Sequence, residues 1–250
     1  MAGRKRLSRR KRRALVWALV LLVAALLPPG IHALRAALAE GREPEALLAS
    51  GFSWESAPSW TGEPYALLTD SVPALSPKVL PPEELVLLSE LDALGRTGPA
   101  LAVAGPGSLP ETPRGEIGDV RPAGFHNVRY DDLIEDRYLY NRCHLIGYQL
   151  SGINADPRDL FTGTRYLNVE GMLPWENELA GFVRRTGCHV LYRVTPLYTG
   201  DELVPRGVEL EAVSMEDGGA GLRFHVLCYN VQPGIVIDYR DGSSRRAKAP

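Results

Sequence analysis

The stretch NRCHLIGYQLSG, residues 141–152, decides how this sequence is interpreted. It places one titratable imidazole, His144, between a polar triplet (NRC) and an apolar pair (LI). Apolar residues of this kind pack a strand into a core. A neutral imidazole, with an ordinary pKa of about 6.5, can accept a proton near neutral pH. The stretch therefore combines a packed strand with a candidate general base.

Strands are predicted on both sides of this stretch. Alternation, together with branched and aromatic residues, predicts strands over 125–130, 138–150, 160–167, 188–198, 207–215 and 222–239. Proline near the start and glycine near the end predict helices over 81–96 and 174–187. The turn EDGGAG, between the last two strands, is typical of a hairpin.

The N-terminus has the pattern of a membrane-targeting segment. Residues 1–13 hold eight Lys and Arg and no acid, and residues 14–27 hold no polar side chain. We therefore predict a cytoplasmic basic tip over 1–13 and a signal-anchor over 14–34. The remaining chain would then be the extracellular part of a single-pass membrane protein. In the alternative, cleavage of a signal peptide near Ala39 releases the protein.

The rest of the chain divides into three predicted parts. Residues 35–80 are rich in Pro, Ser and Gly and form a stalk or lead-in, part of which we expect to dock through Trp54, Trp60 and Tyr65. The main domain spans 81–242, and 243–250 is a frayed tail. The net charge of −2 conceals an acidic body, because without its basic tip the chain has 20 Lys and Arg against 30 Asp and Glu.

Three cysteines, Cys143, Cys188 and Cys228, show no zinc-binding spacing. Their odd number excludes a complete disulfide framework, so we expect them to be packed as small apolar groups. One disulfide between two of them stays open, because the predicted compartment is oxidising.

Two residues downstream of His144 could complete a hydrolytic site. Asn168 follows the predicted strand 160–167, and Glu176 lies in the predicted helix 174–187. Mg²⁺ needs only one or two protein oxygens, so an amide oxygen could hold it while the imidazole takes a proton from water. Spacing by itself leaves the alternative open that His144 is a structural residue.

Several longer stretches carry a resemblance to a known family. They are ELDALGR, RPAGFHNVRYD, YLYNRCHLIGYQLSG, NADPRDLFTGTRYLNVEGMLPWEN, HVLYRVTPLY and FHVLCYNVQPGIVIDYRDG. In order and spacing, residues from about 85 to 242 resemble the DNA/RNA non-specific endonucleases, and among them the DNA-entry nucleases of Gram-positive bacteria. The resemblance implies an α+β fold of the ββα-metal (His-Me finger) type, with a central antiparallel sheet and flanking helices.

The resemblance also assigns roles to individual residues. NRCH stands at the family's Asp-Arg-Gly-His motif, so His144 takes the place of the general base and Arg142 that of the arginine holding phosphate. Asn168 falls on the ligand of a single Mg²⁺, with Mn²⁺ as the alternative metal. Glu176 falls on the glutamate that orients water near the leaving group. The implied substrates are DNA and RNA, cut with little sequence preference.

The sequence departs from the family pattern at three positions. Asn141 replaces the motif's aspartate and Cys143 its glycine, and we interpret both changes as tolerated. Asp159 stands where many members have a second asparagine. A carboxylate there would either add a metal or substrate contact or repel the phosphate.

Phosphate binding usually depends on Lys and Arg, so an acidic body needs a local basic strip. The candidates for this strip are Arg114, Arg142, Arg165, Arg184 and Arg185. Two other functions remain open on the sequence. One is a non-catalytic nucleic-acid-binding module of the same fold. The other is an envelope interaction protein that uses residues 31–80 as its partner site.

Overall fold

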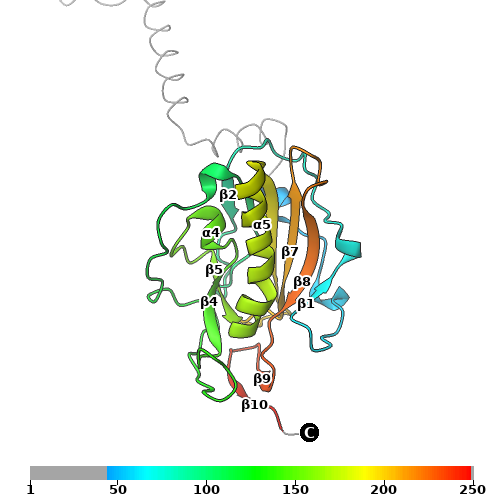
Figure 1. Cartoon of the computed structure of the whole chain (residues 1–250). Coiled ribbons are helices and arrows are strands. Elements are labelled where there is room, and N and C mark those ends of the chain that lie inside the picture. Colours follow the sequence, from blue (N-terminus) through cyan, green and yellow to red (C-terminus); the bar gives the residue numbers. More distant parts are fainter. Residues whose placement is uncertain (1–43, 249–250) are drawn as a thin grey trace, which may run out of the picture.

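A computed structural model describes residues 44–248 of the chain (Figure 1). The predicted basic tip, signal-anchor and cleavage site near Ala39 lie outside these residues and stay predictions. Within residues 44–248, no helix combines the length and the apolar character needed to cross a bilayer.

A six-stranded antiparallel sheet forms the centre of the fold, in the order β1-β8-β7-β6-β3-β2. Its strands are β1 (Tyr65–Leu67), β2 (Leu85–Leu88), β3 (Ala100–Ala104), β6 (Val190–Leu197), β7 (Gly207–Ser214) and β8 (Arg223–Tyr229). The predicted strands at 188–198 and 207–215 and the first part of 222–239 are thereby confirmed. The α+β class with a central antiparallel sheet is confirmed as well.

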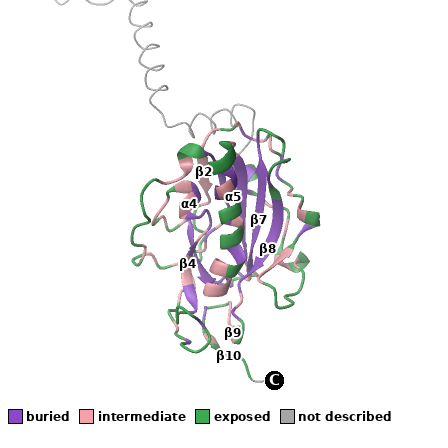
Figure 2. Cartoon of the chain, in the orientation of Figure 1, coloured by how far each residue is buried: buried purple, intermediate pink, exposed green. Residues whose placement is uncertain are grey.

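Helix α5 (Leu173–Thr186) covers one face of this sheet (Figure 1). Its buried residues Leu179, Ala180 and Val183 follow the spacing of a single helical stripe and join the main core. Its opposite side is exposed (Figure 2). Gly187, with φ +71°, ends the helix in the left-handed conformation. The helix predicted over 174–187 is therefore confirmed.

The residues of interest lie on a smaller unit beside the sheet. Strands β4 (Tyr140–His144) and β5 (Leu160–Thr164) pair antiparallel, with His144 opposite Leu160. After β4 comes the short helix α4 (Tyr148–Ser151), and after β5 a π-helical turn, Leu167–Met172, leads into α5. The predicted strand 138–150 thus ends at residue 144, where the chain turns toward α4.

The helix predicted over 81–96 is wrong. Its apolar run forms β2 instead, because pairing with β3 satisfies its backbone groups at the edge of the sheet. The following residues form a turn: the Asp92 carboxylate accepts hydrogen bonds from the backbone N–H groups of Leu94 and Arg96, both at 2.9 Å. Gly95, expected to end a helix, has φ +73° within this turn.

Two further expectations need correction, one in the middle of the chain and one at its C-terminal end. In the predicted strand 125–130, only an isolated bridge between Arg129 and Tyr138 forms. The predicted frayed tail contains strand β10 (Ser244–Arg246), which pairs with β9 (Ile235–Ile237). Apolar side chains of β9 pack against the loop that holds this bridge, which explains why the chain remains ordered there.

Most of the described lead-in packs on the sheet face opposite α5, whereas its strand β1 forms an edge of the sheet and places Tyr65 against Trp175 on the α5 side. It contains α3 (Pro44–Leu48), the 3₁₀ turns Trp54–Ser56 and Thr69–Ser71, and β1. A third 3₁₀ turn, Pro106–Ser108, follows β3. Leu47 and Leu75 join a second core with Leu101 and Leu191, whose neighbours in sequence face the α5 side. Because both faces are covered, β6 and β7 are buried along their whole length, as Figure 2 shows for β7.

All three cysteines are free thiols. Cys143 and Cys228 are buried in the main core, and Cys188 packs against it. The expectation that they serve as packed apolar groups is confirmed.

Candidate active site

His144 ends β4 with its ring held by one hydrogen bond. Its Nε2 lies 2.9 Å from the backbone carbonyl oxygen of Asn154. A carbonyl can only accept, so Nε2 carries the hydrogen and Nδ1 keeps a free lone pair. Burial lowers the pKa of His144, against the raising effect of this hydrogen bond. The imidazole is therefore a neutral base at neutral pH.

Asn168 lies in the π-helical turn between β5 and α5, a local distortion that is frequent at functional sites. Its Nδ2 donates a hydrogen bond of 3.2 Å to Oδ1 of Asn141 on β4. With the amide nitrogen engaged, the Asn168 Oδ1 is directed away from Asn141 as an acceptor. This oxygen is the kind of ligand that a hard divalent cation prefers.

Glu176 lies in the first turn of α5 and is buried. Its Oε1 accepts a hydrogen bond of 3.1 Å from the backbone N–H of Gly147. Burial raises the pKa of Glu176 to about 7, although this hydrogen bond opposes the shift. A Cβ at residue 147 would lie 2.7 Å from the carboxylate oxygens, so any side chain there would displace the carboxylate from this position.

The three side chains meet in one pocket of about 240 Å³. Its lining comprises His144, Gly147, Tyr148, Gln149, Asn168, Met172, Leu173 and Glu176. A second pocket of about 340 Å³, called the cleft below, shares His144 and Asn168 with the first. Asn168 and Glu176 follow His144 by 24 and 32 residues in the chain, yet all three line these two adjoining pockets. The imidazole and the amide line both pockets and so lie where the two meet.

Three arginines line the cleft: Arg114, Arg142 and Arg165. Arg142 lies over the Phe125 ring at 4.4 Å, and its Nε and Nη2 donate to the carbonyl oxygens of Val120 and Gly118 at 2.6 and 2.9 Å. Burial lowers the pKa of Arg142, yet a guanidinium remains charged at neutral pH. The cleft is therefore a positively charged hollow on an acidic body.

The other arginine candidates differ in their surroundings. Arg165 forms an ion pair of 2.6 Å with Asp136 and is partly neutralised by it. Arg184 and Arg185 lie in the last turn of α5, at the opposite end of the helix from Glu176. The structure does not bring these two to the pockets that it describes.

Asp159, predicted as a metal or substrate contact, is not exposed at all. Its Oδ1 accepts a hydrogen bond of 2.9 Å from the backbone N–H of Ile146, and its carbonyl accepts one from Leu145. Burial raises its pKa well above the usual range. Asp159 lines neither pocket; in this structure it holds the turn that follows His144.

Three residues that contribute to the site were not predicted from the sequence as site residues. Asn154 acts through its backbone carbonyl, which leaves no side-chain signal, and Gly147 through the absence of a side chain. In the sequence Asn141 is visible only as a departure from the family motif, whereas in the structure its side chain accepts the hydrogen bond that orients Asn168. Gly147 lies inside the predicted strand 138–150, and a glycine within a strand pattern was the one visible sign that the strand ends early.

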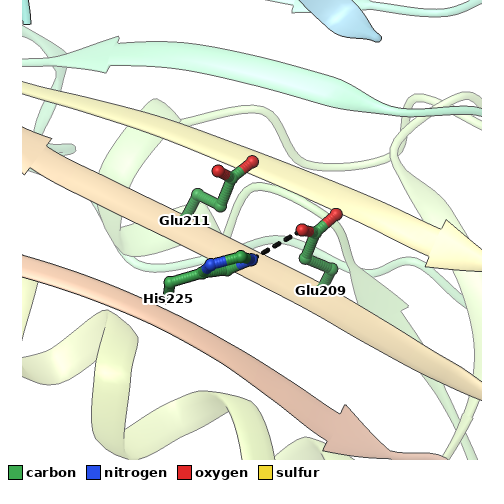
Figure 3. Close-up of side chains that lie close together, drawn as sticks. All are labelled: Glu209, Glu211 and His225. Atoms are coloured by element: carbon green, nitrogen blue, oxygen red, sulfur yellow. Dashed lines mark hydrogen bonds and ion pairs between the residues drawn. The ribbon is translucent and has the colours of Figure 1, made fainter. Parts of the chain in front are cut away.

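A separate cluster of Glu209, Glu211 and His225 has ligand atoms within 4.8 Å of one another (Figure 3). These residues lie on β7 and β8, on the sheet face away from α5, because their neighbours Leu210 and Val226 belong to the α5-side core. His225 Nε2 lies 2.7 Å from Glu209 Oε1.

Positive charge is already present in this cluster. Arg193 forms a buried ion pair with Glu211, and His225 Nδ1 lies 2.7 Å from Thr69 Oγ1. Because a guanidinium balances one carboxylate and both ring nitrogens have partners, the cluster is satisfied as it stands. It is distinct from the pocket of His144 and Asn168.

Comparison with known proteins gives a consistent result. A family model described as DNA/RNA non-specific endonuclease matches residues 84–216. The structure of NucA from Streptococcus agalactiae with a magnesium ion bound is 28% identical, with a TM-score of 0.59, over 66% of this chain and 78% of that one. The Sda1 nuclease with a bound zinc ion is 26% identical, with a TM-score of 0.56, over 65% and 81%. His144, Asn168 and Glu176 all lie inside the matched region.

Proposed function

Since the family model covers more than half of the chain, the protein belongs to the DNA/RNA non-specific endonuclease family and is a phosphodiester hydrolase, and we propose that it cuts DNA and RNA at the pocket lined by His144, Asn168 and Glu176. The observation that carries this proposal is the convergence of the three side chains on one hollow beside a cleft with three arginines. We assign β4, β5 and α5 as the ββα-metal unit.

His144 is the general base of this proposal. Its Nδ1 accepts a proton from the attacking water while Nε2–H stays bonded to the Asn154 carbonyl, so the ring keeps its orientation through the transfer. Burial holds the pKa low, which keeps the ring in its accepting form.

Asn168 is the proposed ligand of one divalent cation. Its Oδ1 fits this role because Asn141 accepts the hydrogen bond of the amide nitrogen, which leaves the amide oxygen available to coordinate a metal ion in the pocket. Mg²⁺, or Mn²⁺ in its place, would supply charge that stabilises the developing negative charge on the phosphate and the leaving oxygen. Relatives with magnesium or zinc bound support a metal requirement.

Glu176 and the cleft arginines complete the proposed machinery. With a pKa of about 7, Glu176 can hold or release a proton at neutral pH, which suits a group that orients water near the leaving oxygen. Arg114, Arg142 and Arg165 would hold the phosphates on either side of the scissile bond. Asp159 has no part in this assignment.

The location of the enzyme follows from residues outside the described part. We propose that residues 14–34 anchor the protein in the cell membrane, or are removed by cleavage near Ala39. In both cases the nuclease domain, assigned to 81–242 together with its packed lead-in, acts outside the cytoplasm.

Cleavage of supercoiled plasmid and of RNA by the purified full-length protein tests this function. We expect nicking with Mg²⁺ or Mn²⁺ that EDTA abolishes, and a loss of roughly 10²- to 10⁴-fold in rate for His144→Ala. His126→Ala is the matched control, because His126 is exposed and lines neither pocket. Unchanged cleavage by His144→Ala would overturn the assignment of the base. Binding of nucleic acid without cleavage under any metal would overturn the proposed reaction.

A further inference from the structure

The cleft contains aromatic rings as well as arginines. Phe125, Tyr138 and Tyr140 all contribute to its lining. Two of these rings have little surface left for a ligand: Tyr140 is only 2% exposed, and the guanidinium of Arg142 lies over the ring of Phe125. Tyr138 is 41% exposed. Tyr138 is therefore the most exposed of the three rings in the described cleft; the guanidinium over it, that of Arg129, lies farther from its ring than that of Arg142 lies from Phe125.

The Tyr138 ring is held in place although it is exposed. Its backbone forms the bridge to Arg129, flanked by hydrogen bonds from Tyr130 N to Arg137 O at 2.7 Å and from Leu139 N to Val128 O at 2.9 Å. The Arg129 guanidinium lies 5.6 Å from the ring centroid. A positioned ring loses little conformational freedom when a flat ligand stacks on it.

The charge and polarity around Tyr138 fit a nucleotide. The arginines Arg114 and Arg142 share the cleft with it, and Asn127 is an exposed neighbour in the same lining. An amide offers both a donor and an acceptor, so it can contact any base edge without selecting one. Aromatic stacking is equally tolerant of sequence, because every base has a π-face.

We propose that Tyr138 is a stacking platform for one base next to the scissile phosphate, and that the enzyme consequently favours unpaired nucleic acid. The inference depends on the proposed function, because it names the substrate form taken by the same site. A base in a duplex is already stacked on both sides and paired, so it must leave the helix before it can lie on Tyr138. A single strand avoids that cost.

Three substrates of one length test this proposal with the full-length protein and Mg²⁺: a single-stranded oligonucleotide, its duplex, and a strand with abasic sugars around one central linkage. For Tyr138→Ala we expect kcat/KM on the single strand to fall about fivefold to a hundredfold, the range that loss of one stacking ring produces. The preference for the single strand over the duplex and over the abasic linkage should shrink with it. Tyr138→Trp should restore the preference.

Trp60→Ala is the matched control, because Trp60 is also 41% exposed but lies in the lead-in and lines neither pocket. A second readout needs no turnover: in the His144→Ala background with EDTA, Tyr138→Ala should weaken binding of a fluorescent single strand by a similar factor.

Different failures separate the two proposals. If the wild type cuts nucleic acid but Tyr138→Ala changes neither the strand preference nor the affinity for the fluorescent single strand, the stacking role is wrong. The proposed nuclease function is then unaffected. If Tyr138→Ala lowers cleavage of all three substrates equally, the ring only shapes the cleft and the inference is again wrong. If the wild type cuts nothing, the proposed function itself fails.

Discussion

At the residue scale, one carbonyl oxygen determines what His144 can do. The Asn154 carbonyl lies 2.9 Å from Nε2 and assigns the hydrogen to that nitrogen, so the proposed base is Nδ1. Burial lowers the pKa, and the nearby charge of Arg114 acts in the same direction. Both effects keep the ring unprotonated.

The acid limb of activity should therefore lie below the ordinary histidine pKa of about 6.5. Protonation of Nδ1 removes the lone pair that accepts the proton from water, and a lowered pKa moves that loss to lower pH. We expect an NMR titration to place the His144 signal, assigned by comparison with His144→Ala, at the pH where kcat/KM falls. A titration above pH 6.5 would contradict this account.

Asn141 controls the direction of the Asn168 amide. Replacing Asn141 by Ala removes the acceptor for Asn168 Nδ2, and the amide becomes free to rotate. We expect the Mg²⁺ concentration for half-maximal cleavage to rise about tenfold, the lower end of the range for residues that orient metal ligands.

Asn141→Asp is the matched control for this prediction, because a carboxylate oxygen can accept the same hydrogen bond. It should keep the metal requirement near that of the wild type. Calorimetric titration with Mg²⁺ gives the same comparison without turnover, and equal affinities for Asn141→Ala and the wild type would show that the orientation is fixed by other contacts.

At the scale of elements, the pairing of β4 with β5 explains why a cysteine fits at position 143, where the family motif has glycine. A Cβ at Gly163 on β5 would overlap the Cys143 sulfur, so the thiol fills the space that a larger residue at 163 would need. The two positions form a packed pair, and each limits what the other can be.

Gly163→Ala should destabilise the protein by about 1–3 kcal/mol, the usual cost of overpacking a core. Cys143→Gly in the same chain should remove much of that cost, because it deletes the sulfur that the new methyl group meets. Urea unfolding of the two single variants and the double variant measures the coupling. Additive changes in unfolding free energy would mean that the two side chains do not compete for this space.

The β2 strand shows where local pattern misleads. The run Leu85–Leu88 fits a helix as readily as a strand, since four apolar residues are too few to show a period. Pairing with β3 decides for the strand, and β3 is itself a short run, Ala100–Ala104, within a passage rich in Pro and Gly.

At the scale of the whole molecule, a buried network ties the lead-in to the sheet. Glu209 accepts hydrogen bonds from His225 (Figure 3) and from Ser50. Glu211 accepts one from the backbone N–H of Ala74 at 2.8 Å and pairs with Arg193. Burial lowers the pKa of His225. The hydrogen bond to Glu209 and the charges of Glu211 and Glu209 outweigh this effect, so the net pKa is raised.

Stability should consequently fall as the medium becomes alkaline. A histidine whose folded pKa is raised contributes stability that is fully present below its unfolded pKa and lost as pH rises through the folded value. We expect urea unfolding between pH 5.5 and 9 to show this loss in the wild type, and His225→Gln to lack that part of the dependence. A difference between the two proteins that grows with pH would contradict the sign.

The same measurement with EDTA, made in the Asn168→Ala variant so that metal at the proposed active site does not contribute, separates a proton from a metal in this network. Because the Arg193 guanidinium already balances Glu211, we expect no change in unfolding free energy on chelation. A marked loss of stability with EDTA would identify the cluster as a metal site.

Short-range pattern determined several parts of this protein by itself. Residues close together in the chain specify the apolar stripe and the ends of α5 and the strands β6 to β8, so these elements could be predicted. The spacing of NRCH, Asn168 and Glu176 can likewise be read directly from the sequence. The family follows from the same local order.

Only the tertiary structure decided the rest. The His144 nitrogen that is available as the proposed base depends on a carbonyl ten residues away, and the absence of Asp159 from the lining of both described pockets depends on its burial beneath a turn. The packing of the lead-in depends on contacts such as that of Ser50 with Glu209, 159 residues apart. Hydrogen-bond partners and burial are properties of the folded surroundings, and a sequence records the side chains without recording which of them will meet.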